Sequence, residues 1–230
     1  MKRTCAIILA AGKGNRMNKG INKQYIKLKN KPILYYTLKA FLKSELIDDV
    51  IVVAAQDEID YCRREVVEKY NMCKVSKIIE GGLQRQDSVL NGLKAVKNCD
   101  IVLIHDGARP FINEFIIKNA IKYAKLYGAS ACGVSPKDTI KIKCNDGFSH
   151  STLKREELFC VQTPQSFRYD LILECHKKIK KQNINVTDDT MVVERYGHKV
   201  YLYEGSYDNI KITTPEDLVI AQNLLDKVSY

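Results

Sequence analysis

The chain has 230 residues, of which 45% are hydrophobic and 28% are charged. This composition is typical of a folded globular protein and excludes wholesale disorder. It holds no apolar stretch of 18 residues, so we expect no membrane span, and glycine and charge follow the first apolar run too soon for a secretion signal. The net charge of +10 is scattered along the chain without interleaved aromatic residues, which disfavours a nucleic-acid partner.

Apolar segments alternate along the chain with amphipathic ones. The apolar segments are almost continuously hydrophobic, which is typical of strands that are buried on both faces of a sheet. The strands predicted in this way are residues 5–11, 49–55, 76–81, 100–106 and 129–135. The alternation predicts a single α/β domain over residues 1–230, with three layers and a mostly parallel sheet.

The segments between the predicted strands have the periodicity of helices. Asn113 is expected to cap a helix that stops at Gly128, and Thr214 to cap a last helix whose first residue is Pro215. Apolar residues share one helical face in two further segments: Leu34, Leu38, Phe41 and Leu42 in the first, and Val89, Leu90, Leu93 and Val96 in the second.

Residues 138–153 break this alternation. Their side chains alternate in polarity up to a turn at Asn145-Asp146-Gly147, so they predict a β-hairpin, the core of an arm over about residues 136–158. An isolated hairpin is marginally stable in water. We therefore expect the arm to pack on another surface, for which a second copy of the chain is a candidate.

Glycines and cations follow the first predicted strand, in Gly12-Lys13-Gly14-Asn15-Arg16. Ligands of open α/β sheets bind beyond the carboxyl ends of strands, where glycine lets backbone N–H groups approach phosphate oxygens. Arg16 and Lys23 would add positive charge there. The alternative is a tight turn with incidental surface cations.

Asp106 ends the fourth predicted strand and should reach the same edge of the sheet. A carboxylate in this place can hold Mg²⁺ or bind sugar hydroxyls, although a plain ion pair with Arg109 is the alternative. His105 is interpreted as structural. Gly81-Gly82 and Ser88 follow the third predicted strand and suit either the close approach of a flat base or a glycine turn with a helix cap.

Six motifs occur in order along the chain: L-A-A-G-x-G-x-R-M, N-K-Q-Y, E-G-G-x-x-R-x-x-S-V, H-D-G-A-R-P-F, R-E-E-L-F-x-x-Q-T-P-Q-x-F and D-N-I-K-I-T-x-P-E-D-L. In this combination the chain resembles the 2-C-methyl-D-erythritol 4-phosphate cytidylyltransferases over essentially its whole length. The resemblance implies a Rossmann-like nucleotidyltransferase fold and the joining of CTP to methylerythritol phosphate with release of pyrophosphate, in the non-mevalonate route to isoprenoids.

The resemblance also implies a role for each matching residue. Nucleotide binding would fall to Ala10, Ala11, Gly12, Gly14, Gly82, Arg85 and Ser88. Arg16 and Lys23 would stabilise charge on the α-phosphate, while Arg155 and Lys211 would position the substrate phosphate. Asp106, Arg109, Thr139 and Thr163 would surround the methylerythritol phosphate, and Asp106 is also the candidate ligand of Mg²⁺, which would be bound mainly with the CTP phosphates.

By the same resemblance the arm would swap between the subunits of a homodimer, so that Thr139 and Arg155 serve the partner's site. The eight cysteines show no C-x-x-C spacing and mostly fall in apolar runs, which fits a reducing cytoplasm.

Two other functions remain open at this point. A ribitol-5-phosphate cytidylyltransferase would have a similar fold and motif order, but it commonly shows H-D-S-V-R-P where this chain has H-D-G-A-R-P. A basic, non-catalytic nucleic-acid-binding protein would need its cations in one surface stripe.

Overall fold

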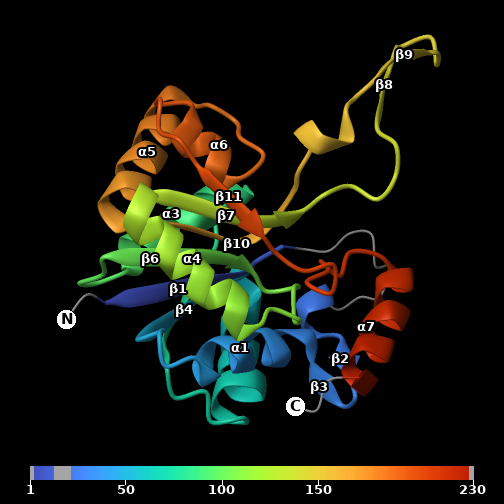
Figure 1. Cartoon of the computed structure of the whole chain (residues 1–230). Helices are drawn as coiled ribbons and strands as arrows, with labels where there is room; N and C mark the ends of the chain where they lie inside the picture. Colours follow the sequence, from blue (N-terminus) through green and yellow to red (C-terminus); the bar gives the residue numbers. More distant parts are fainter. Residues whose placement is uncertain (1–2, 13–21, 228–230) are drawn as a thin grey trace.

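The computed structural model describes residues 3–12 and 22–227, so Arg16 and Gly14 lie outside the described residues. Its centre is a seven-stranded sheet with the strand order β11-β7-β10-β6-β1-β4-β5 (Figure 1). The strands are β1 (Thr4–Ala10), β4 (Asp49–Ala54), β5 (Val75–Glu80), β6 (Ile101–Asp106), β7 (Ala129–Val134), β10 (Cys160–Arg168) and β11 (Tyr201–Glu204). All five predicted strands are confirmed, each to within one residue at both ends.

The sheet is mostly parallel, as predicted, but one central strand runs the other way. β1 pairs in parallel with β4 and β6, and β4 with β5, whereas β10 lies antiparallel between β6 and β7. The sequence did not predict β10 because its middle residues, Gln162 to Ser166, are mostly polar. Those residues are nevertheless buried in the sheet.

Helices cover both faces of the sheet, which gives the three predicted layers (Figure 1). One core contains side chains of α1 (Ile33–Lys43), α2 (Ile59–Cys62) with the π-helix Arg63–Glu68, α4 (Glu114–Tyr127) and α7 (Pro215–Lys227). The other core contains side chains of α3 (Arg85–Ala95), α5 (Tyr169–Gln182) and α6 (Asp189–Glu194). Alternate residues of β1 enter opposite cores, since Ile8 belongs to the first and Ile7 to the second.

The predicted helix ends are found where side chains can satisfy free backbone groups. The Asn113 side chain accepts the N–H of Ile116 at 3.0 Å, and Gly128 ends α4 with a φ of +89°, which favours glycine. Pro215 is the first residue of α7. Within residues 3–12 and 22–227, none of the helices is long and apolar enough to cross a membrane.

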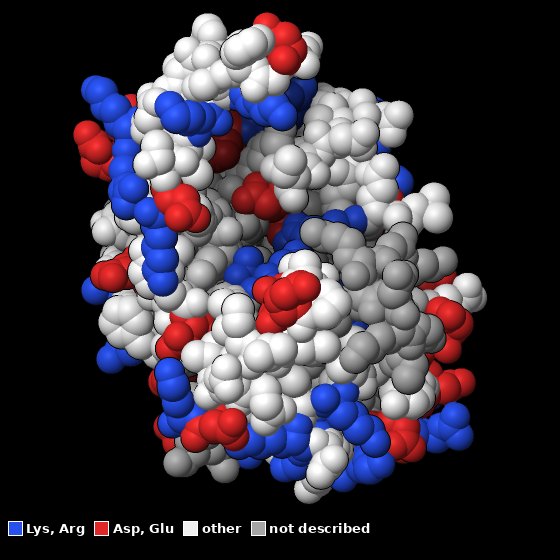
Figure 2. All heavy atoms as spheres, turned by 90° about the vertical axis from the view of Figure 1, so that its right-hand side faces the viewer, with Lys and Arg blue, Asp and Glu red and all other residues white. Residues whose placement is uncertain are grey.

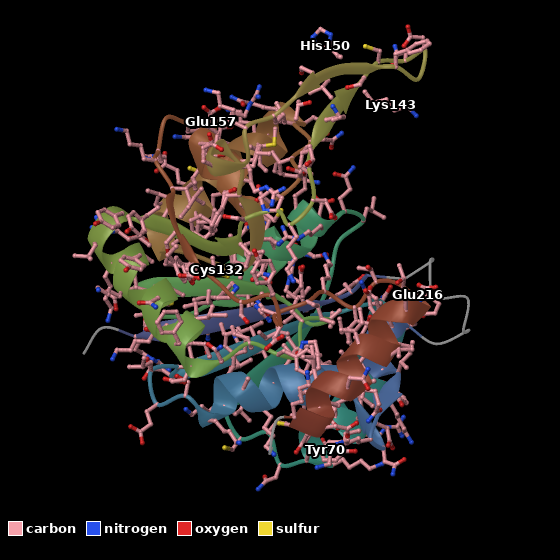
Figure 3. The ribbon with its side chains drawn as sticks, turned by 45° about the vertical axis from the view of Figure 1, so that its right-hand side comes forward. Tyr70, Cys132, Lys143, His150, Glu157 and Glu216 are labelled. Carbon is pink, nitrogen blue, oxygen red and sulfur yellow. The ribbon has the colours of Figure 1, made fainter. Side chains whose placement is uncertain are left out.

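The arm is a hairpin of β8 (Lys141–Lys143) and β9 (Ser149–Thr152) that projects from the body (Figure 1). Its strands pair antiparallel, as predicted, with Ile142 opposite Ser151. Lys143 and His150, which Figure 3 labels, lie at the outer part of the arm, far from the sheet. Ile142 and Phe148 are 45% and 75% exposed, so the arm presents apolar side chains to solvent.

Short elements complete the chain. β2 (Lys27–Leu28) and β3 (Lys31–Pro32) form a small ladder before α1. Single 3-10 turns are formed by Lys23–Tyr25, Gln56–Glu58 and Arg155–Glu157.

Candidate active site

The carboxyl ends of β1, β5 and β6 meet at one edge of the sheet and border a cavity of about 620 Å³. Figure 2 shows this face of the molecule hollowed, with acidic and basic side chains inside the hollow. The lining residues are Leu9, Ala10, Ala11, Gly12, Lys23, Gln24, Gly82, Leu83, Gln84, Arg85, Ser88, Asp106, Ala108 and Lys211. The cavity is thus lined by predicted residues from five separate motifs.

Asp106 is the acidic residue of this lining, and three cations surround it. Lys211 Nζ lies 2.8 Å from Oδ2, Arg109 Nε lies 3.7 Å from Oδ2, and Arg85 Nε lies 3.7 Å from Oδ1. Burial by itself would raise the pKa of Asp106, but Lys211, Arg85 and Arg109 together hold it below its ordinary value. The carboxylate is therefore ionised at neutral pH. The ion pair with Arg109, which was the alternative interpretation of Asp106, is present, although Lys211 makes the shorter contact.

Thr163 and His105 support Asp106 from behind the cavity. The Thr163 hydroxyl oxygen accepts the Asp106 backbone N–H at 3.1 Å and lies 3.1 Å from His105 Nδ1. His105 Nε2 faces the Arg109 carbonyl at 3.1 Å, and a carbonyl only accepts, so the proton of this neutral ring is on Nε2. Nδ1 must then accept from Thr163, which leaves the hydroxyl without a proton for a ligand.

Burial lowers the pKa of His105 to about 4, so the ring is neutral at physiological pH. His105 is fully buried and Thr163 is 4% exposed. The structural interpretation of His105 agrees with this geometry. Thr163 does not line the cavity, and its contacts hold the end of β6 in place.

Arg109 is attached to the segment that carries Lys211. Its Nη1 donates to the Asn209 carbonyl at 2.7 Å. The Asn209 side chain is buried and donates to the Thr163 carbonyl and to Gln162 Oε1, at 2.9 and 3.1 Å. These contacts explain how Lys211, close to the C-terminus, is held against the end of β6.

The glycine loop after β5 packs tightly against its neighbours. A Cβ on Gly81 would lie 2.5 Å from that of Ala11, and one on Gly82 would lie 2.2 Å from that of Asp87. Ser88 Oγ accepts the Gly82 N–H at 3.0 Å and donates to the Gln84 carbonyl at 3.2 Å. Packing alone therefore requires both glycines, while Gly82 and Ser88 also line the cavity.

Two predicted residues lie on the arm side of the molecule, away from the cavity. Thr139 is exposed before β8, and Arg155 is exposed in the 3-10 turn after β9. Neither lines the cavity. Among the described residues, the predicted residues of the body lie at the cavity or directly behind its wall, whereas these two lie outside.

Sequence reasoning missed several residues of the site. Gln24 lines the cavity and its amide donates to the Ala10 carbonyl, so it fixes the end of β1. Gln24 and Asn209 stand inside quoted motifs, which was a usable signal for both. Ala108 also stands inside a quoted motif, whereas Leu83 and Gln84 occupy unspecified positions of the glycine motif and gave no signal in the sequence.

Comparison with known proteins settles the family. The model of the family described as IspD, 2-C-methyl-D-erythritol 4-phosphate cytidylyltransferase, matches residues 4–227. The chain belongs to this family.

Its relatives agree over nearly full length. The 2-C-methyl-D-erythritol 4-phosphate cytidylyltransferase of Clostridium novyi is 64% identical over 228 residues, which are 99% of each chain. That of Clostridium acetobutylicum is 60% identical over 225 residues, which are 98% of each chain. Among solved structures, the 4-diphosphocytidyl-2C-methyl-D-erythritol synthase of Anaerococcus prevotii has a TM-score of 0.86 and 34% identity, over 98% of this chain and 96% of that one.

Family membership makes the chain a nucleotidyltransferase, as the motifs predicted. It also accounts for the position of the cavity. The nucleotide and acceptor of such an enzyme are both anionic, and the described cations at this sheet edge include Lys23, Arg85 and Lys211.

Proposed function

We infer that the chain transfers the cytidylyl group from CTP to 2-C-methyl-D-erythritol 4-phosphate, giving 4-diphosphocytidyl-2-C-methyl-D-erythritol and pyrophosphate in isoprenoid biosynthesis. The observation that carries this function is the ionised Asp106 in the cavity wall, with Lys211 and Arg85 beside it in the lining and Arg109 paired with it outside the lining. The family and its close relatives support the choice of acceptor over ribitol phosphate. An enzyme of this class also explains the scattered basic charge without a nucleic-acid partner.

In the reaction, a phosphate oxygen of the acceptor bonds to the α-phosphorus of CTP, and the bond from that phosphorus to the bridging oxygen of the β-phosphate breaks. Pyrophosphate leaves with those bonding electrons. The nucleophile is already an anion, so the barrier lies in bringing two anions together and in stabilising charge on the transferring group. We assign the second task to Lys23 and Arg16, of which Arg16 lies outside the described residues.

Lys211 positions the acceptor phosphate in this proposal. Its side chain is 39% exposed while its ammonium contacts the Asp106 carboxylate, so Lys211 is fixed on one side and accessible to a ligand. Asp106 then faces the polar part of the acceptor, while Arg109, which does not line the cavity, acts through its ion pair with Asp106. The Thr163 hydroxyl donates its proton to His105 and therefore has none to donate to the acceptor. Thr163 acts on the acceptor only by holding Asp106 in position.

Recognition of cytosine is assigned to the glycine loop. The Ser88 hydroxyl donates to Gln84 and accepts from Gly82, which leaves one acceptor position on its oxygen. That position suits the exocyclic amino group of cytosine and not the carbonyl of uracil. Ala10, Ala11 and Gly12 would lie along the nucleotide, and a Cβ on Gly12 would meet nothing within 4 Å.

Magnesium would enter with the triphosphate. Mg²⁺ is commonly bound by one or two carboxylates together with substrate phosphates, and Asp106 supplies one ionised carboxylate in the lining. Within residues 3–12 and 22–227, there is no group of three His, Cys, Asp or Glu side chains arranged to hold a metal alone. The residues therefore fit an ion that CTP helps to bind, whose chemistry would be to neutralise phosphate charge.

We propose a homodimer in which each arm completes the site of the other subunit. The exposed apolar side chains Ile142 and Phe148 support docking of the arm on a protein surface. Thr139 and Arg155 would travel with the arm to the partner's cavity. A reducing cytoplasm is supported by the eight cysteines, all described and all free.

The decisive experiment measures pyrophosphate release with purified chain and Mg²⁺. We expect turnover with CTP and methylerythritol phosphate, and at most slow turnover with ribitol 5-phosphate or with UTP. Equal rates with both acceptors would contradict the assigned acceptor, and equal rates with CTP and UTP would contradict the role of Ser88.

A further inference from the structure

A second carboxylate lies directly behind the cavity wall. Asp189, the first residue of α6, is fully buried. Its Oδ2 lies 2.8 Å from Arg85 Nη2, and its Oδ1 lies 3.1 Å from His176 Nε2. One carboxylate thus joins the N-terminus of α3 to α5, although none of the sequence motifs singled it out.

The position of Asp189 is fixed from the central sheet. Its backbone N–H donates to Gln165 Oε1 at 2.8 Å, and Gln165 Nε2 donates to Asp188 Oδ2 at 2.9 Å. The other Asp188 oxygen accepts the Met191 N–H and caps α6. Gln165 belongs to β10, the strand that also carries Thr163, so Asp189 and the support of Asp106 share one rigid element.

Arg85 is held between two carboxylates. Its Nη2 is at 2.8 Å from Asp189, while its Nε is at 3.7 Å from Asp106. About a third of the Arg85 side chain, 32%, is exposed where it lines the cavity. The guanidinium is therefore fixed through Nη2 by Asp189, and its remaining N–H groups are available to the nucleotide.

The charge on Asp189 decides which cation Asp106 binds closely. If Asp189 lost its charge, Arg85 would keep one of its two ion pairs among the described residues, the pair with Asp106. Arg85 would then move toward Asp106 and compete with Lys211, which now contacts that carboxylate at 2.8 Å. With both carboxylates charged, Asp189 holds Arg85 and Asp106 holds Lys211, so the two cations stay apart.

We propose that Asp189 is a positioning residue of the cytidylyl transfer: it holds Arg85 at the nucleotide and so reserves Asp106 for Lys211. This inference rests on the proposed function. It assigns Asp189 no contact with substrate, since the side chain is buried behind Arg85.

A double-mutant cycle with Asp189→Asn and Arg85→Ala tests the inference, with kcat and KM measured from pyrophosphate release. Asp189→Asn is expected to lower kcat/KM for CTP about tenfold and to raise the KM for the acceptor phosphate about tenfold, because Arg85 displaces Lys211. Adding Arg85→Ala removes the competitor. The double variant should therefore match Arg85→Ala within about twofold in both constants, including recovery of the acceptor KM.

If Asp189 only stabilised the fold, its loss would lower thermal stability and leave both KM values unchanged. A control variant in the same helix should show this pattern. Val193→Ala, a cavity in the buried apolar side of the same helix, lowers thermal stability without touching Arg85 and should leave both KM values within about twofold. If Asp189→Asn does not fold, Asp189→Ser, which keeps an acceptor for His176, replaces it in the cycle.

The outcomes separate this inference from the proposed function. An active parent chain whose double variant loses the product of the two single losses, or whose Asp189→Asn variant matches the parent, overturns the positioning role alone. A parent that releases no pyrophosphate from CTP and methylerythritol phosphate overturns the proposed function and with it this inference.

Discussion

The Asp106 cluster and the arm carry the two halves of the predicted site, and they differ in how far one chain completes them. Around Asp106, side chains from β6, α3 and the segment before α7 meet at 2.8 to 3.7 Å. On the arm, Thr139 and Arg155 are exposed. A parallel sheet gathers strand ends by its topology, whereas a hairpin outside the sheet needs another surface to place its residues.

The largest expected effect comes from the Asp106 cluster. Lys211→Ala should lower kcat/KM for the acceptor phosphate by about 10²–10³-fold, because a fixed cation at the transferring groups is lost. Steady-state pyrophosphate release measures it. Lys94→Ala, an exposed lysine of α3, is the matched control and should keep the parent's rate. A loss below about fivefold in Lys211→Ala would remove Lys211 from its role.

The next effect concerns the pH dependence of stability. Burial lowers the pKa of His105 to about 4, whereas an unfolded histidine titrates near 6.5. Above pH 6.5 both states are neutral at this site. As pH falls from about 6.5 to about 4, the unfolded chain takes up a proton that the folded chain refuses, so the free energy of unfolding falls by up to about 3 kcal/mol.

Urea unfolding at several pH values between 7.5 and 4.5 measures this change. His105→Asn should flatten the decrease, whereas His150→Asn on the exposed arm should leave it as in the parent. Equal slopes in the parent and in His105→Asn would contradict the neutral, buried histidine.

The smallest effect on folding is expected in the arm. Phe148 is 75% exposed, so Phe148→Ser should change the free energy of unfolding of the chain by at most about 0.5 kcal/mol. The same substitution should weaken dimerisation, which sedimentation equilibrium measures, while Lys143→Ser serves as the control on the same hairpin. An unchanged dissociation constant would show that the arm docks without Phe148.

The sequence predicted those parts of the fold whose pattern is local. Continuous apolar runs found five of the parallel strands but not the short edge strand β11, and alternation with an Asn-Asp-Gly turn found the arm. β10 was missed because Gln162, Thr163 and Gln165 are polar side chains that the fold buries through hydrogen bonds. A strand of polar residues in the middle of a sheet has no hydrophobic periodicity from which it could be predicted.

The candidate site divides in the same way. Asp106 and the glycine loop were found because each stands at a strand end, whereas Lys211 was assigned through the family resemblance of its motif. Asp189 was missed because Thr187-Asp188-Asp189 has the composition of an ordinary helix cap, and its partners Arg85 and His176 lie on other helices. Only the folded chain brings these charges together.

Subunit complementation tests the shared site most directly. Lys211→Ala and Arg155→Ala chains, each nearly inactive alone, are mixed under conditions that allow exchange, and pyrophosphate release is measured. If Arg155 serves the partner's cavity, each mixed dimer has one site with both cations, and random pairing restores about a quarter of the parent's activity. If the mixture stays as inactive as its components, Arg155 acts within its own chain and the site is not completed by the partner's arm.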